Sequence, residues 1–268
     1  MIIHEAQWNT LKMNDQAEDD SLWELFHENS KMDIYSPPPA PAEVYKKVTK
    51  LYESLPYQAC PKIPFKPTPD ELTMSLSESI HARSSVRTMS STPITFDQLG
   101  SLLYYSYGVT RSNEGTDIPR PFRATPSAGG LYPLEIYIAT SAEIKDIAPG
   151  LYHYNSREHC LSTLQKGNTV AELSQHLIQK DIAKNSTLLV MITSLFQRTV
   201  FKYKARGYRY ALLEAGHLGQ NMALVAAALK LGLAPLGGYQ DREVDNYLGI
   251  DGINHSTLYM AAIGQRDL

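Results

Sequence analysis

Residues 210–232 read YALLEAGHLGQNMALVAAALKLG, a long and largely apolar stretch. Its pattern predicts a helix from Tyr210 to Leu231 that ends at Gly232. The apolar faces of such a helix are too broad to be buried against a single sheet. We therefore expect either a central core helix or a helix that meets a symmetry mate in a dimer.

Three polar residues interrupt the apolar helix. Glu214, His217 and Asn221 follow one another at spacings of three and four, so they lie along one stripe. The simplest interpretation is a buried network of mutually hydrogen-bonded groups. A two-metal site is a weak alternative, because helical bundle sites use two Glu-x-x-His motifs and this stretch has one.

The stretches around this helix predict strands. A continuous apolar run, Thr187–Thr193, is typical of a strand covered on both faces, and another strand is expected at Thr257–Ile263. A β-branched run predicts a strand at Leu134–Ala139. Residues 150–154 and 159–164 form two strands joined by a polar turn. Strands and helices alternate without regular βαβ spacing, which predicts a layered α+β fold.

Further helices are predicted from capping signals and apolar spacing. Thr95 and Gln98 form a capping box for a helix through Tyr107, with Gly108 at its C-cap. The other expected helices are one that begins near Leu76 and runs into a polar loop at Arg83, and one over Thr169–Lys180. A long loop is expected over residues 111–122.

The N-terminal quarter has a different composition. Nine prolines between Pro37 and Pro69 predict mostly extended structure, apart from an amphipathic helix over Ala42–Leu55. Acidic residues before Leu22 predict a short capped helix there. We interpret residues 1–70 as an extension that wraps a main domain of residues 71–268. A flexible tail is the alternative.

Composition excludes several classes. The 268 residues include 43% hydrophobic and 20% charged residues, which fits a folded globular protein of one large or two small domains. A net charge of -3 provides no excess of positive charge that would attract nucleic acid or an anionic membrane. Cys60 and Cys160 are too few for a disulfide scaffold, so we expect a cytoplasmic protein. The first residues lack the pattern of a signal peptide, and polar residues interrupt the longest apolar stretch, so no membrane span is expected.

Common catalytic motifs are missing. The sequence has no G-x-G-x-x-G, no P-loop lysine, no G-x-S-x-G and no H-E-x-x-H. What remains is a set of separated clusters. Arg83 to Arg87 offer two guanidinium groups and two hydroxyls, which suit a phosphate and a polyol chain, although such runs are usually solvated surface. The small residues of 126–130 and 235–239 allow backbone amides to approach a planar ligand.

These clusters belong to a series of short motifs whose order and spacing are specific together. They are Arg83-Ser84-Ser85-Val86-Arg87, residues 126–135, residues 150–154, Lys202-Tyr203, residues 206–210, residues 213–217, Gln220-Asn221 and Gly237-Gly238. With them the chain resembles nitroreductase-like FMN proteins, and among these the SagB-type dehydrogenases, which include the azoline oxidases of peptide natural products. The resemblance covers about residues 75–268, and residues 26–31 show a weaker similarity.

The resemblance implies a nitroreductase-like fold with FMN bound at a homodimer interface. The cofactor-binding residues that it implies are Arg83, Ser84, Ser85, Arg87, Pro126, Ser127, Ala128, Gly129, Leu236, Gly237, Gly238 and Arg266. The residues between Arg83 and Arg87 would contact the phosphate, the ribityl chain and the pyrimidine edge of FMN. Residues 127–129 would reach the flavin from the partner subunit. Gly237 and Gly238 would lie beside flavin N5. The family often has paired arginines where this chain has Arg83-Ser84, so phosphate contacts are expected to be fewer.

Lys202 and Tyr203 match the pair that is catalytic in azoline oxidases. Aromatising a thiazoline or oxazoline removes a proton from one ring carbon and a hydride from its neighbour, so a base is needed. The base can be a lysine whose pKa is lowered by desolvation or nearby cations, or a tyrosinate that the lysine stabilises. The alternative is an exposed basic stretch. We expect Lys202→Ala to retain FMN and lose turnover.

Three functions remain open. The first is an FMN-dependent dehydrogenase that acts on a heterocyclic or dehydroamino-acid precursor of a peptide-derived metabolite, working as a homodimer and possible partner of other biosynthetic enzymes. The second is a nitro or quinone reductase supplied by NAD(P)H. The third is a flavin-binding scaffold subunit, with residues 1–70 as its docking arm.

Overall fold

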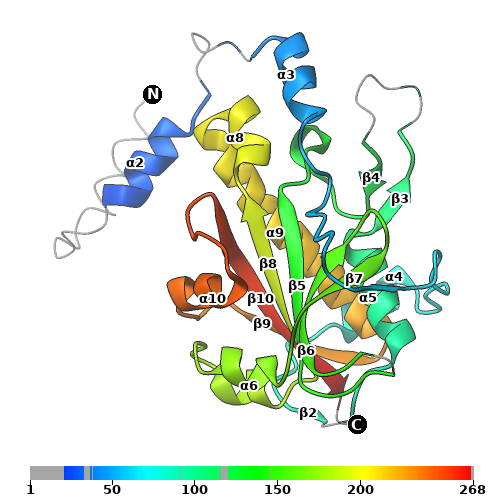
Figure 1. Cartoon of the computed structure of the whole chain (residues 1–268). Coiled ribbons are helices and arrows are strands. Elements are labelled where there is room, and N and C mark those ends of the chain that lie inside the picture. Colours follow the sequence, from blue (N-terminus) through cyan, green and yellow to red (C-terminus); the bar gives the residue numbers. More distant parts are fainter. Residues whose placement is uncertain are drawn as a thin grey trace.

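A computed structural model describes residues 21–32, 37, 39–90, 92–113, 115, 120–145 and 147–266 (Figure 1). Its centre is one large antiparallel sheet with the strand order β1-β7-β6-β5-β8-β10-β2, in which β9 pairs with the free side of β10. The strands are β1 Lys62–Pro64, β2 Met89–Ser90, β5 Leu134–Thr140, β6 Gly150–Asn155, β7 Cys160–Lys166, β8 Leu188–Leu195, β9 Leu231–Leu236 and β10 His255–Arg266. A separate pair is formed by β3 Val109–Arg111 and β4 Phe122–Arg123.

Helices cover both faces of the sheet, which confirms the layered α+β prediction. The helices are α2 Ser21–Asn29, α3 Pro41–Val48, α4 Leu76–Ala82, α5 Phe96–Tyr107, α6 Thr169–Ser174, α7 Lys180–Lys184, α8 Gln197–Tyr203, α9 Ala205–Ala228 and α10 Asp241–Leu248, with a 3-10 turn at Ala128–Gly130. One face packs against α5 and α9, and the other against α6, α7 and α10.

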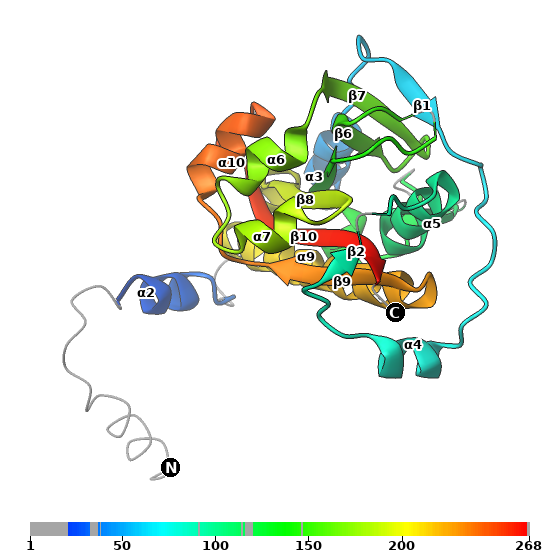
Figure 2. The ribbon, with the colours of Figure 1, turned by 90° about the horizontal axis from the view of Figure 1, so that it is seen from below.

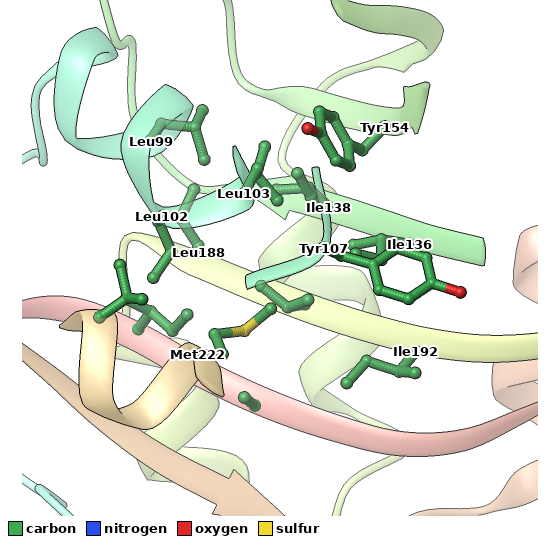
Figure 3. Packing of buried hydrophobic residues seen from close by; sticks show 14 of the residues in the cluster. Leu99, Leu102, Leu103, Tyr107, Ile136, Ile138, Tyr154, Leu188, Ile192 and Met222 are labelled. Carbon is green, nitrogen blue, oxygen red and sulfur yellow. The ribbon is translucent and has the colours of Figure 1, made fainter. Parts of the chain in front are cut away.

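The core follows from the alternation of strand side chains. Ile136 and Ile138 of β5 point to the α5 and α9 side, whereas Tyr137 and Ala139 between them point to the other face. Figure 3 shows Leu102 of α5 and its neighbours meeting these isoleucines in the first cluster. The same alternation continues through β8. Both faces of the central strands are therefore dry, as their continuous apolar sequences predict.

Most predicted elements are confirmed, and the capping box is as expected: Gln98 N donates to Thr95 Oγ1 over 3.1 Å, and Thr95 N donates to Gln98 Oε1 over 2.8 Å. The long helix is shifted, because it spans 205–228 rather than 210–231. After it Lys230 adopts φ +61°, and the chain reverses directly into β9, which the sequence interpretation had not assigned. The expected loop at 111–122 begins and ends in the short β3–β4 pair.

Two other helix predictions were too long. The helix expected over 169–180 is broken into α6 and α7, because Leu177 bridges to Tyr239 and Ile178 N donates to Gly238 O over 2.9 Å. The helix expected to reach Leu55 ends at Val48. The chain then makes a turn in which Leu51 N donates to Val48 O over 3.2 Å, and Arg120 binds the carbonyl groups of Val48 and Leu51.

The described part of the N-terminal region is tied to the sheet. β1 forms an edge strand against β7, with Lys62 opposite Ser162, so residues 39–70 do not form a flexible tail. α2 lies to one side of the body (Figure 2), where Phe26 contacts the ring of Tyr208 at a centroid distance of 5.4 Å. The acids expected to cap α2 lie outside the described residues, and the division at residue 70 stays a prediction.

Candidate functional site

A cavity of about 200 Å³ opens between α9, the paired strands β9 and β10, and the segment that follows α4. Its lining consists of Arg83, Ser84, Ser85, Ile192, Gly216, Gly219, Gln220, Met222, Ala223, Leu233, Pro235, Tyr259 and Ala261. Sequence reasoning had named only the first three of these as ligand-binding residues. Gly216 and Gln220 belong to motifs of the resemblance to which no ligand contact was assigned, whereas Gly219 and Tyr259 were missed because they lie in no local motif.

The local fold explains how the first motif reaches the cavity. A capping box between Ser75 and Glu78 begins α4, and the chain leaves the helix at Arg83 in an extended conformation. Ser85 then forms a parallel bridge to Leu233, and Val86 N donates to Leu233 O over 2.9 Å. The motif is thus held as a short extra strand along β9, with its polar side chains exposed.

Arg266 joins the same group from the far end of the chain. It ends β10, where it pairs with Met89, and its guanidinium group donates to Ser84 Oγ over 2.8 Å. Arg266 is not itself a lining residue, but it contacts the cavity lining through Ser84, the neighbour of Arg83. Arg87 is exposed and lies outside the lining.

The residues at the end of β9 are divided by strand alternation. Pro235 is exposed and lines the cavity, whereas Leu236 is buried in the opposite hydrophobic cluster. A methyl group added at Gly237 would meet no atom within 4 Å. At Gly238 it would lie 2.7 Å from the terminal methyl group of Ile178, so this glycine allows close packing against the loop after α6.

A second cluster brings together two motifs that are far apart in sequence. Gly129, in the turn of residues 126–130, has φ +64°, and a methyl group there would lie 2.5 Å from Tyr203 Oη and 2.8 Å from Lys202 Nζ. Lys202 Nζ lies 5.1 Å from the centroid of the Tyr203 ring. Both side chains are half-buried, whereas the next residue, Lys204, is exposed. The pair is therefore packed against the turn and is not part of a solvated basic run.

The two clusters are separate within one chain. Among the described residues, the cavity lining includes none of 126–130 and neither Lys202 nor Tyr203. It uses residues 216–223 of α9, whereas Lys202 and Tyr203 lie in α8, before the first residue of that helix. In the turn before the lining residues, α9 exposes Leu212 (42%) and Leu213 (58%).

Glu214 lies beneath the 126–130 turn. It is 2% exposed, accepts a hydrogen bond from Tyr107 Oη over 2.8 Å, and is hydrogen-bonded by the Ser127 hydroxyl. Burial raises its pKa to about 7, although these hydroxyls and the guanidinium group of Arg123 oppose the rise. The side chain can therefore hold a proton near neutral pH.

The polar stripe on α9 is only partly the buried network predicted for it. Asn221 donates to Thr125 Oγ1 over 3.2 Å, and Glu214 is bonded as described. His217 is exposed, so the prediction was wrong there, because this position turns to the open face of the helix. Within the described ranges no group of three or more His, Cys, Asp or Glu side chains could hold a metal ion.

A second buried acid, Glu135, was not recognised as part of the site. Its carboxylate binds Arg198 at 2.6 Å and His153 Nε2 at 2.6 Å. Burial alone would raise its pKa, but Arg198 and His153 outweigh this and hold the pKa at about 2. The sequence did contain a signal for this pair, because Glu135 lies within an apolar strand sequence. A charge in such a position is buried only together with a partner of opposite charge.

Both cysteines are free thiols. No helix in the described part of the chain is long and apolar enough to cross a membrane.

Residues 80–265 match the model of the nitroreductase family. The chain belongs to the nitroreductase family. The match spans the first motif, both clusters and almost all of β10, and it makes the protein an oxidoreductase of this family.

Two curated relatives support the assignment. The Methanocaldococcus jannaschii protein MJ1384, which is named as a nitroreductase, is 31% identical over 182 residues, or 68% of this chain and 88% of the relative. The Escherichia coli microcin B17-processing protein McbC is 32% identical over 140 residues, which is 50% of each protein. The match to the microcin protein therefore covers half of that relative.

Solved structures share the fold. A protein from Anabaena variabilis described as a nitroreductase superposes with a TM-score of 0.73 and 24% identity over 96% of this chain and 49% of the other. The Escherichia coli microcin synthetase McbBCD complex with truncated pro-MccB17 bound gives 0.58 and 22% identity over 92% and 93%. A Desulfovibrio desulfuricans protein in complex with FMN gives 0.51 and 16% identity over 72% and 87%.

Proposed function

We propose that this nitroreductase-family protein is an FMN-dependent dehydrogenase of SagB type that oxidises a thiazoline, an oxazoline or a related peptide-derived precursor. The observation that carries the proposal is the packing of Lys202 and Tyr203 against Gly129. A base is thereby placed on the turn that the resemblance assigns to flavin contact. The relation to a microcin B17-processing protein supports the same class of substrate.

The cavity has the groups that FMN requires. Arg83 and Ser84 line it and Arg266 contacts Ser84, and guanidinium and hydroxyl groups of this kind bind phosphate. Gly216 and Gly219 carry no side chain, so α9 leaves space in the cavity beside them. A methyl group added at Gly216 would meet no atom within 4 Å. Open backbone at Gly237 offers room beside a planar ring. We propose that FMN is held here.

A homodimer would complete the site. The cavity lining includes no residue of the Lys202 cluster, and α9 exposes Leu212 and Leu213 in the turn before its lining residues. Leu76 and Ile80 of α4 are also exposed, at 67% and 53%. Burial of these apolar side chains against a second copy would bring the turn of one protomer to the cavity of the other. The division of the site therefore supports a shared one.

The chain's own residues would manage the proton of the reaction. FMN, when bound, supplies a hydride acceptor. Lys202 Nζ and Tyr203 Oη lie together on the turn, so one can take the ring proton while the other stabilises the charge that results. The rigid turn and the half-buried positions limit access of water to this pair.

The test compares Lys202→Ala with Lys184→Ala. Both lysines lie in the last turn of a short helix, but Lys184 is exposed and far from the motifs. We expect both purified proteins to show flavin absorbance. Only Lys202→Ala should lose conversion of a synthetic thiazoline peptide to the thiazole, by 100-fold or more on the order of general base effects. Equal turnover by the two variants would remove the pair from the mechanism.

A reductase supplied by NAD(P)H is the second candidate, because the relative that matches most of this chain is named as a nitroreductase. Anaerobic addition of NADH and NADPH separates the two. Rapid bleaching of the flavin bands, with no thiazoline turnover, would support the reductase. A scaffold role within a biosynthetic complex would instead require that the isolated protein be inactive on the peptide until partner proteins are added.

A further inference from the structure

The N-terminal region contacts the Lys202 cluster directly. We name residues 44–57, which begin in α3, the strap. Val48 of the strap is 1% exposed and packs in a small hydrophobic cluster with Val44 and Leu131. Phe201 and Tyr203 of α8 pack against the same cluster. Tyr203 therefore has the strap on one side and the 126–130 turn near its hydroxyl.

A buried arginine connects the strap to the turn. The guanidinium group of Arg120, 6% exposed, donates to Val48 O over 3.0 Å and to Leu51 O over 2.8 Å. It also donates to Leu131 O over 3.3 Å, one residue after the turn. One cation thus fixes three backbone groups of two separate segments. Displacing the strap from the turn would cost these hydrogen bonds to a buried cation, which opposes the displacement.

The far end of the strap is anchored on the sheet. Arg123 donates to the carbonyl of Glu53, and Leu55 N donates to Glu135 Oε1 over 3.0 Å. Tyr57 and Tyr137 share a hydrogen bond of 2.7 Å between their hydroxyls. The strap is therefore held at its start by Arg120 and at its far end by Glu135 and Tyr137 of β5, so it is part of the folded body.

We propose that the strap is a positioning segment of the catalytic site: it presses the end of α8, with Lys202 and Tyr203, against the 126–130 turn. This inference rests on the proposed function of that pair. α8 has only seven residues and ends where Lys204 takes φ +51°. A helix this short does not hold itself in place, so tertiary packing must fix its last turn. In the described structure Val44 and Val48 supply that packing from the N-terminal side.

The experiment compares Val48→Ala with Val170→Ala in the full chain as purified. Both valines are 1% exposed, but Val170 lies in α6, which packs at the opposite end of the sheet (Figure 1). Hydrogen–deuterium exchange is measured for residues 126–131 and 197–203. We expect exchange there to become about tenfold faster in Val48→Ala, at unchanged flavin content, and to stay at the wild-type rate in Val170→Ala. Val44→Ala provides a second variant on the same face.

Turnover of a thiazoline peptide supplies the second readout. We expect Val48→Ala to lower kcat about tenfold and leave KM within twofold, because the substrate still binds while the base is misplaced. Unchanged exchange in both segments would overturn the proposal, and so would equal effects of the two variants. If the wild type converts no thiazoline peptide, the proposed function fails, and the exchange result still decides whether the strap holds α8.

Discussion

Glu214 allows a prediction whose size follows from its surroundings. The carboxyl is buried, and its pKa is raised from the usual 4.5 to about 7. Between these two values the unfolded chain has lost the proton while the folded chain keeps it. Folding stability must therefore fall as the pH rises through this window. At about 1.4 kcal/mol per pH unit, the loss amounts to about 3 kcal/mol.

Glu214→Gln removes this loss. The amide approximates the protonated acid: its oxygen can accept from Tyr107 Oη, and its NH₂ group can donate to Ser127 Oγ. We expect the stability of the variant relative to wild type to improve by about 3 kcal/mol between about pH 4.5 and about pH 8. Urea unfolding followed by far-UV circular dichroism at both pH values measures this difference. All other titrating groups cancel, because the two proteins share them.

The control is Glu214→Ala, which leaves the hydroxyls of Tyr107 and Ser127 without their acceptor. We expect it to be less stable than Glu214→Gln at both pH values, by about 1–3 kcal/mol for each buried hydroxyl. A constant gap between wild type and Glu214→Gln at the two pH values would refute the reasoning. Such a result would mean that the carboxyl has the same pKa in the folded and the unfolded chain.

Three further predictions use other parts of the site. Gly129→Ala and Gly130→Ala both place a side chain at positive φ, at a similar strain of about 1 kcal/mol, but only the first meets Lys202 and Tyr203, the proposed catalytic pair; we expect thiazoline turnover to fall at least about tenfold more in Gly129→Ala, and equal rates would contradict this. Glu135→Gln leaves a buried arginine without its charge partner, so urea unfolding at pH 7 should show a loss of about 3–5 kcal/mol. The difference in unfolding free energy between wild type and Glu135→Gln should shrink as the pH falls from 4.5 toward about 2. The depressed pKa of the wild-type carboxyl stabilises the folded state above this range, and that stability is lost as the carboxyl becomes protonated. Arg266→Ala should weaken FMN binding about tenfold in a flavin fluorescence titration, while exposed Arg242→Ala should not, and identical affinities would exclude Arg266 from the phosphate site.

The sequence was sufficient for the elements that have strong local signals. The apolar run of β8, the alternation in β5 and the capping box of Thr95 and Gln98 each depend on residues close together in the chain. Boundaries were less accurate where long-range contacts decide them. The bridge from Leu177 to Tyr239 divides the helix predicted over 169–180, and no residue within that segment indicates it.

The candidate site shows the same limit. Motifs identified the two polar ends of the site, because their residue types carry the chemistry. They could not show that Gly129 lies against Lys202 and Tyr203, because that contact joins segments more than 70 residues apart. The role of Arg198 was missed for a similar reason. Its partner, Glu135, lies 63 positions away on a different element.

The arginines of this chain divide into two sets with different capacities. Arg120, Arg123 and Arg198 are each less than 7% exposed, and their donors are directed to backbone carbonyls or to a buried carboxylate. Donors engaged in this way are not free to bind an incoming anion. Arg83 lines the cavity and Arg266 contacts its lining through Ser84; both are exposed, so their remaining donors can exchange water for phosphate oxygens. The first set therefore holds the backbone around the Lys202 cluster, and we expect a phosphate to bind the second set.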